Sequence, residues 1–166
     1  MKQLFFIICL LLFVASNTFS QSPPDVQSLT GLPGVAVAFS KYPEQLERDG
    51  LASKQIAIEA ELRLRKAGIK VLALDEALKS PGSPVFEIQL GAVKSETGLY
   101  AISVRLRLNQ IVITQRKPFI ETVSATWEAN NLLLVKSADL RRVKDEVGDG
   151  VDVFANDFLT ANPKPK

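Results

Sequence analysis

Three arginines are the residues whose type and spacing best suit ligand recognition. Arg105 and Arg107 stand two residues apart in the alternating segment LYAISVRLRL, so a strand projects both from one face, and Arg116 follows near the end of that strand. Guanidinium groups bind carboxylates and other anions in a bidentate manner. The three residues therefore predict a shallow anion-binding surface. The alternative is a solvated strand face on which the arginines pair with Glu87 or Glu121.

Trp127, the only tryptophan, is the fourth candidate binding residue. It closes a predicted strand beside a turn, and tryptophan is over-represented in binding hot spots, where it anchors a ligand or a partner. The alternative, which we favour, is packing at the end of the sheet with the indole N–H bonded to a loop.

The composition excludes the nucleophile systems and metal sites that depend on histidine or cysteine. The chain contains no histidine, and its one cysteine, Cys9, lies in a hydrophobic N-terminal segment. No serine begins an S-x-x-K motif, and the chain has no glycine-rich phosphate-binding motif. We therefore expect neither a cofactor nor a metal ion, and the protein is predicted not to be an enzyme.

Acidic side chains offer the remaining chemistry. Asp145, Asp149 and Asp152 share one stripe of the last predicted helix, but the calcium-loop pattern is absent, so they indicate a solvated polar face. Glu87 and Glu121 could serve as acid and base if they lay on neighbouring strands and their environments separated their pKa values. This arrangement gives an alternative prediction, a hydrolase with paired carboxylates.

The N-terminal segment LFFIICLLLFVASNTFSQ predicts export. Lys2 precedes an unbroken apolar run over residues 4–14, and small and polar residues follow, as in a signal peptide that is cleaved after Ser20. A permanent transmembrane helix needs about 20 apolar residues, so this run is too short. Cys9 lies inside the run, which argues against lipidation. We expect a periplasmic or secreted protein with no transmembrane helix after signal cleavage.

The mature chain is predicted to be one domain with little net charge. Removing residues 1–20 from 166 leaves 146 residues, with 19 Lys and Arg (20 less Lys2) against 18 Asp and Glu. Such a balance gives no general attraction to nucleic acid. Residues 21–33, rich in Pro, Ser and Gly, predict an extended lead-in, residues 34–162 the domain, and residues 163–166 a tail.

Hydrophobic periodicity predicts the strands that position these side chains. They are expected at 34–39, 69–74, 85–93, from 99 to a break at 116–118, and at 119–127, with a bulge near Asn109 in the fourth. The sequence also predicts a long loop at 75–84, a hairpin loop at 95–98 and a turn at 128–131. Residues 132–135 could form a short strand or lead into the final helix.

Two helices are predicted. The first covers 51–67 and has a second apolar stripe, which we expect to pack inside the protein rather than against a partner. That stripe consists of Leu51, Ile58 and Leu62. The last helix runs from an N-cap at Ser137 to Asn162. Gly148 and Gly150 each weaken it by about 1 kcal/mol relative to alanine, so either packing holds it together or it kinks there.

These elements predict an α+β fold, with a mostly antiparallel sheet of about five strands and two helices on one face. This arrangement buries the apolar stripes of both helices and leaves the opposite sheet face polar. The residues expected on that face are Glu87, Gln89, Ser103, Arg105, Arg107, Thr122, Ser124 and Thr126.

The segments SATWEANN and VFANDFLTANPK resemble those of an uncharacterised family of small bacterial exported proteins. In that family a Thr-Trp pair near the last strand precedes a final helix that ends in Phe-x-Asn-Asp-aromatic-Leu. The matching residues are Thr126, Trp127, Phe154, Asn156, Asp157, Phe158 and Leu159. The resemblance implies export but no established activity. The order of elements is also similar to that of periplasmic accessory proteins such as the lipopolysaccharide-assembly lipoprotein, which is a similarity of architecture alone.

The sequence thus predicts an exported, non-enzymatic binding or accessory module of the bacterial cell envelope. It would hold an envelope protein or a small ligand through the polar sheet face and the Trp127 end. The alternatives are a carrier of a lipid or small apolar ligand between helices and sheet, and the hydrolase with paired carboxylates.

Overall fold

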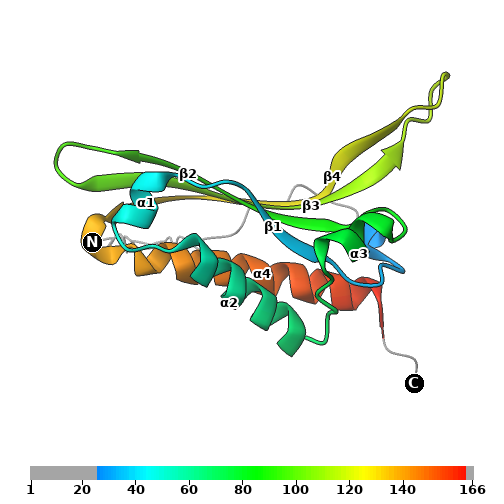
Figure 1. The fold of residues 1–166 in the computed structure, drawn as a ribbon, viewed down its shortest axis with the longest axis horizontal. Coiled ribbons are helices and arrows are strands. Elements are labelled where there is room, and N and C mark those ends of the chain that lie inside the picture. The colour runs from blue at the N-terminus through cyan, green and yellow to red at the C-terminus, as the bar shows by residue number, and fades with distance from the viewer. Residues whose placement is uncertain (1–25, 164–166) are drawn as a thin grey trace, which may run out of the picture.

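The computed structural model describes residues 26–163, which form an α+β fold around one four-stranded mixed sheet (Figure 1). The predicted signal peptide, residues 1–20, lies outside the described residues. The strands are β1 (Ala36–Lys41), β2 (Val85–Lys94), β3 (Leu99–Ile113) and β4 (Glu121–Lys136), and they lie in the order β1-β2-β3-β4. β1 is parallel to β2, and β2, β3 and β4 form an antiparallel meander.

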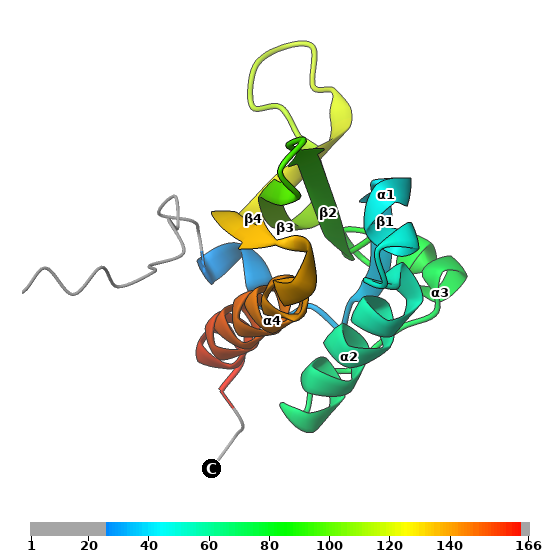
Figure 2. The same ribbon diagram turned by 90° about the vertical axis from the view of Figure 1, so that its left-hand side faces the viewer.

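The α-helices are α1 (Glu44–Arg48), α2 (Ser53–Lys66), α3 (Leu74–Lys79) and α4 (Arg141–Ala161), and Val26–Leu29 and Ser137–Asp139 are 3-10 helices. Figures 1 and 2 show α2 and α4 side by side along one face of the sheet. We call this the covered face, and the opposite one the uncovered face. The prediction of about five strands is wrong, because the sheet has four. The first pair is parallel because the chain crosses through α2 and α3 between β1 and β2.

The core lies between the covered face and the two long helices. The inward residues of β3 from Tyr100 to Leu108 are fully buried, and they meet the apolar stripe of α4. Aromatic rings fill one end of this layer: the ring centroid of Phe154 lies 4.6 Å from that of Phe86 and 5.0 Å from that of Trp127. Burial of these large rings is the main source of stability in this part of the fold.

The strand predicted at residues 69–74 is wrong. The segment makes only an isolated parallel bridge between Val35 and Val71, and α3 begins at its last residue, Leu74, and continues to Lys79 within the loop that was expected at residues 75–84. Asp75 and Glu76 lie in the first turn of α3, where carboxylates favour the helix dipole. Ala77 is buried against β1, which fixes the short helix at that edge.

The turn predicted at residues 128–131 is also wrong, because β4 runs through this segment without a break. Polar side chains that suggested a turn instead bond to neighbouring elements on both sides of the strand. Glu128 and Asn130 contact the arginines of β3 on the uncovered face, and Asn131 donates to Glu146 of α4. Residues 132–135, whose structure the sequence left open, belong to β4.

β3 is one long strand, as predicted, and its pairing with β4 shifts between Leu108 and Asn109. Thr126 is the extra residue at this irregularity. Beyond it the two strands continue as a two-stranded ribbon, which we call the arm (β3 from Ile111, β4 to Val123, and the loop between them). Figure 1 shows the arm extending past the sheet and turning away from the helices.

Two expectations about the helices are resolved by their packing. The second apolar stripe of α2 is not internal, because Ile58 is 57% and Leu62 46% exposed, while only Leu51 is buried. α4 lies beside α2 rather than over it, so nothing in the described part of the chain covers this side of α2. α4 is continuous through Gly148, and the guanidinium of Arg63 crosses it so closely that a Cβ at this position would lie 2.6 Å away.

The segment before β1 differs from the extended lead-in that was expected at residues 21–33. Within the described part, residues 26–29 form a 3-10 helix, and the side chain of Leu29 is fully buried in the core. Asn162, which follows α4, donates to the Leu29 carbonyl and accepts from the Gly31 N–H. The two ends of the domain are therefore joined.

Candidate binding surface

Side chains on the uncovered face form rows that run across the strands, because paired residues on neighbouring strands project to the same side. The strand register defines two polar rows in the middle of the face. The first consists of Lys41, Gln89, Arg105 and Asn130, one from each strand. The second, one step nearer the arm, contains Glu87, Arg107 and Glu128. Arg105 and Arg107 therefore lie on this face, side by side along β3.

The two arginines differ in how their charges are balanced. Arg107 forms an ion pair with Glu128, with 2.9 Å between Nε and Oε2. Arg105 donates from Nε to the neutral Asn130 Oδ1 at 2.9 Å, and within residues 26–163 it has no ion pair. Asn130 in turn donates to Glu128 at 2.5 Å. The alternative interpretation paired the arginines with Glu87 or Glu121. Glu87 does lie opposite Arg107, but the ion pair of Arg107 is with Glu128, from the segment predicted as a turn, and Glu121 lies further along, opposite Ile113.

The other two candidates lie elsewhere. Arg116 is in the loop at the tip of the arm, whereas Arg105 lies eight residues before the end of β3 at Ile113. Trp127 is only 1% exposed, so its ring is not available to a partner. Its indole Nε1 donates to Asp157 Oδ2 at 2.8 Å, so the favoured core packing is observed with a partner on α4 in place of a loop.

The carboxylates of Glu87 and Glu121 are not neighbours. Glu87 lies opposite Arg107, whereas Glu121 lies opposite Ile113, six residues further along β3, and the whole of β3 separates β2 from β4. Asn109 also donates to Glu87 at 2.6 Å. Glu87 and Glu121 therefore cannot act together on one bond, and this pair does not supply the paired carboxylates that the hydrolase prediction requires.

Apolar side chains lie on both sides of the polar rows. Towards the loop at residues 95–98, exposed apolar side chains project from β2 and β4, the two strands that flank β3: Val93 is 72%, Leu132 70% and Leu134 64% exposed. The register places Val93 and Leu134 in one row on either side of Ala101. We call these three residues the apolar end of the uncovered face.

The arm carries the second exposed apolar group. Ile111 lies opposite Val123, and Ile113 follows on the same side of β3, so all three continue the uncovered face. Gln110, between them in the sequence, points the other way and is buried, where it donates to Thr126 and to the Ser28 carbonyl. The alternation of apolar residues is interrupted at residues 109–110 because the apolar side chains change to the other face of the strand there. Up to Leu108 they are buried in the core, and from Ile111 they are exposed.

A groove of about 740 Å³ lies on the outer side of the helix layer, between α2 and α4. The exposed Ile58 and Leu62 line it, and all of its charged groups except Lys66 pair with one another. Glu59 lies 2.7 Å from Lys144 Nζ, and Arg63 pairs with Asp152 and with Glu59. Lys144 and Arg63 lower the pKa of the Glu59 carboxyl. The groove therefore offers little free charge with which to select a partner.

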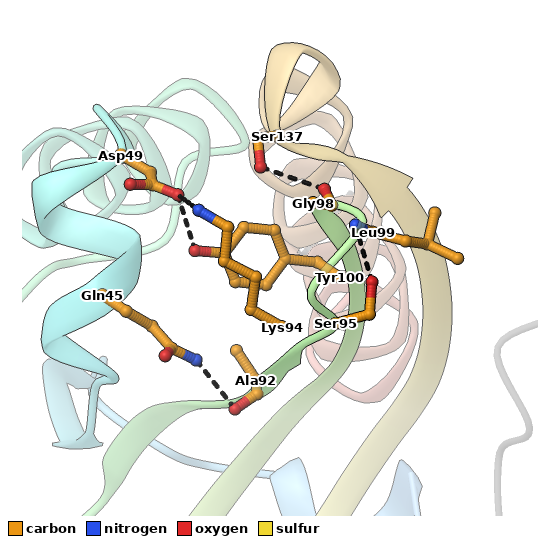
Figure 3. A network of polar contacts seen from close by, with 9 residues as sticks. All are labelled: Gln45, Asp49, Ala92, Lys94, Ser95, Gly98, Leu99, Tyr100 and Ser137. Atoms are coloured by element: carbon orange, nitrogen blue, oxygen red, sulfur yellow. Dashed lines mark hydrogen bonds and ion pairs between the residues drawn. The ribbon is translucent and has the colours of Figure 1, made fainter.

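A network of polar contacts stabilises the sheet near the loop at residues 95–98, beside the apolar end (Figure 3). Asp49, which follows α1, accepts from Lys94 Nζ at 2.5 Å and from the Tyr100 hydroxyl at 2.7 Å. These two hydrogen bonds hold the pKa of the Asp49 carboxyl below its usual value. Gln45 of α1 also donates to the Ala92 carbonyl. The network ties α1 to β2 and β3, so the strands are fixed where the apolar side chains project.

The described residues show neither a metal centre nor a membrane span. No three acidic side chains within residues 26–163 are grouped so that they could hold a metal ion. Within the same range, no helix has the length and apolar character needed to cross a bilayer. Comparison with protein families and with curated proteins found no match to this chain.

Sequence reasoning missed Lys41 and the apolar end. Lys41 follows the predicted end of the first strand at Phe39, and only the observed extension of β1 brings it beside Gln89. Leu132 and Leu134 alternate with the buried Leu133 and Val135. The sequence LLLV conceals this alternation because both faces are apolar, and such a run is typical of a strand buried on both sides.

Proposed function

We propose that the protein is a binding module that holds a partner protein on the uncovered face of its sheet. The observation that carries this proposal is the exposure of apolar side chains at both ends of a polar middle, on the face of the sheet opposite the helices. Contiguous exposed apolar surface rimmed by polar groups marks interaction sites in soluble domains.

The extent and shape of the face favour a protein over a small molecule. From Ala101, beside the apolar end, to Ile113 in the arm is 12 residues of β3, or about 40 Å at strand spacing. Small-molecule sites are concave and enclose most of the ligand, whereas this surface is long and open. A partner that covered both apolar groups would also bury the polar rows between them.

The alternative of an apolar carrier finds less support. It requires a cavity between helices and sheet, but the rings of Phe86, Trp127 and Phe154 pack against one another in that layer. The signal-peptide pattern at residues 1–20 supports export, so we place the partner in the cell envelope or outside the cell.

Site-specific photo-cross-linking in cells that naturally produce the protein tests the proposal. A photoreactive residue replaces Leu132 on the uncovered face or, as the control, the exposed Asp145 on α4. We expect a discrete protein adduct from position 132 that position 145 does not give. The proposal fails if position 132 gives no adduct, or if both positions give the same adducts.

A further inference from the structure

We propose that the uncovered face contains a niche that binds a carboxylate, and that the carboxylate is an acidic side chain of the partner protein. The niche is a hollow of about 190 Å³, lined by Lys41, Gln89, Leu90, Gly91, Ser103 and Arg105. This inference rests on the proposed function, because it assigns the chemistry by which the same face recognises its partner.

The hollow exists because Gly91 has no side chain. Gly91 lies opposite Ser103 on the uncovered face, and a Cβ at this position would come within 2.6 Å of the Ser103 hydroxyl oxygen. Alanine would therefore occupy the space and turn the hydroxyl aside. The backbone of Gly91 is ordinary strand, so glycine is not required here by conformation. Its absence of bulk is what opens the face at this point.

Two cations face the hollow, and neither has an acidic partner among residues 26–163. Lys41 and Arg105 stand on either side of Gln89 in one row, about 10 Å apart at the spacing of neighbouring strands, within reach of one small anion. No ion pair or hydrogen bond of the Lys41 ammonium occurs within the described residues. Arg105 uses Nε to hold Asn130, which fixes the guanidinium and leaves its two terminal nitrogens for a bidentate contact.

The acidic groups of the neighbouring row do not fill the niche. Glu87 and Glu128 lie one row nearer the arm, where Asn109 bonds to Glu87 and Arg107 pairs with Glu128. Ser103 and Gln89 add a hydroxyl and an amide that can donate to an incoming oxygen. The combined charge and donors suit an anion, and the flat surroundings admit one that projects from another protein.

The apolar end specifies what lies beside this acidic side chain. The Gly91–Ser103 row also contains Leu132, and the next row contains Val93 and Leu134. A partner segment with a carboxylate followed by large apolar side chains would place the carboxylate in the niche and bury these three residues. Polar contacts would then set the orientation, and apolar burial would supply most of the affinity.

An NMR titration of the isotope-labelled protein tests the niche directly. The probe is a short capped peptide with one glutamate next to two leucines, and its control is the same peptide with glutamine. We expect saturable shifts of the Lys41, Gly91 and Arg105 amides, and roughly fivefold tighter binding of the glutamate peptide, the upper range for one exposed ion pair. This preference should shrink as salt is raised.

Variants distinguish binding by the niche from a general electrostatic attraction to the positive charges of the uncovered face. Arg105→Gln, Lys41→Gln and Gly91→Ala should each remove most of the preference for glutamate. Lys136→Gln removes one positive charge from β4 six residues from Asn130, and it should leave the preference unchanged. Dispersed spectra of the free variants show that each remains folded.

Three results would overturn the niche: no saturable binding of the glutamate peptide, equal affinity for both peptides, or an unchanged preference in Arg105→Gln. If cross-linking at position 132 succeeds while the glutamate preference is absent, the face binds its partner by other chemistry and only this inference fails. If the preference is present but position 132 gives no adduct, the niche stands and the proposed function fails.

Discussion

The covered and uncovered faces of the sheet are built from the same strands but have opposite characters. On β3, Tyr100, Ile102 and Val104 point towards the helices and are fully buried, while the intervening Ser103 and Arg105 face solvent. On β4, the buried Leu133 alternates with Leu132 and Leu134, which are exposed although they are the same residue type. Burial in the core accounts for the apolar side chains on the covered face, but it does not account for those on the uncovered face.

This difference separates stability from binding along each strand. Substitutions that point inward should weaken folding, because they remove close packing. Substitutions that point outward should leave folding nearly unchanged and alter only what the protein holds. The comparison can therefore be tested in the full chain by substitutions in the core, in the polar contacts at its edge and on the uncovered face, taken from the largest expected loss of stability to the smallest.

The largest effect is expected from Phe154→Ala in α4. Phe154 is fully buried and contacts the rings of Phe86, Trp127 and Phe158, so its removal leaves a cavity where the helix meets the covered face. The free energy of unfolding should fall by about 3–5 kcal/mol in urea denaturation. A loss below ~1 kcal/mol would show that this layer is not the close-packed core described here.

A smaller loss is expected from Trp127→Phe. The variant keeps an aromatic ring in the cluster but removes the indole N–H that Asp157 accepts. Loss of a hydrogen bond to a charged group costs about 1.5–3 kcal/mol, and the smaller ring adds to this. Urea denaturation should show this loss, with partner binding retained at concentrations of denaturant where the variant is folded. Loss of binding by the folded variant would place Trp127 back in the binding surface.

The network around Asp49 should give a loss of stability that depends on pH. Because the folded pKa of Asp49 is lowered from 3.8, its charged form stabilises the fold above that pH, and this contribution disappears as pH falls through the folded pKa. The stability difference between the wild type and Asp49→Asn should therefore shrink below pH 3.8. Lys94→Gln removes the main donor and should have the same effect. A difference that stays constant with pH contradicts the assigned cause.

The smallest change in stability is expected on the uncovered face. Leu134→Ala and Arg105→Glu should each change the free energy of unfolding by no more than about 0.5 kcal/mol, because both side chains are exposed. In the same samples, affinity for the partner should fall. A destabilisation comparable to that of Phe154→Ala would mean that this face is covered by part of the protein itself.

Helices and strands with a clear hydrophobic periodicity could be predicted from the sequence. Elements in which a run of polar or apolar residues masks that periodicity could not. α2, α4 and the alternation of β2 and β3 were expected close to their observed bounds, since one face of each is continuously apolar. The strand at residues 128–131 was missed because its polar side chains find partners on other elements, which no local pattern reveals. Arg105 could be chosen from its alternation, but its separation from Arg116 and its proximity to Lys41 follow only from strand register.

Native mass spectrometry of the protein purified gently from the cells that produce it tests the central claim most directly. The wild type is compared with two variants, one carrying Leu132→Arg and Arg105→Glu on the uncovered face, the other carrying Ile58→Arg and Leu62→Glu in the groove of α2. We expect a partner protein to remain bound to the wild type and to the groove variant, and to be lost from the uncovered-face variant. A partner retained by the uncovered-face variant and lost from the groove variant, or a lipid bound in place of any protein, would contradict the claim.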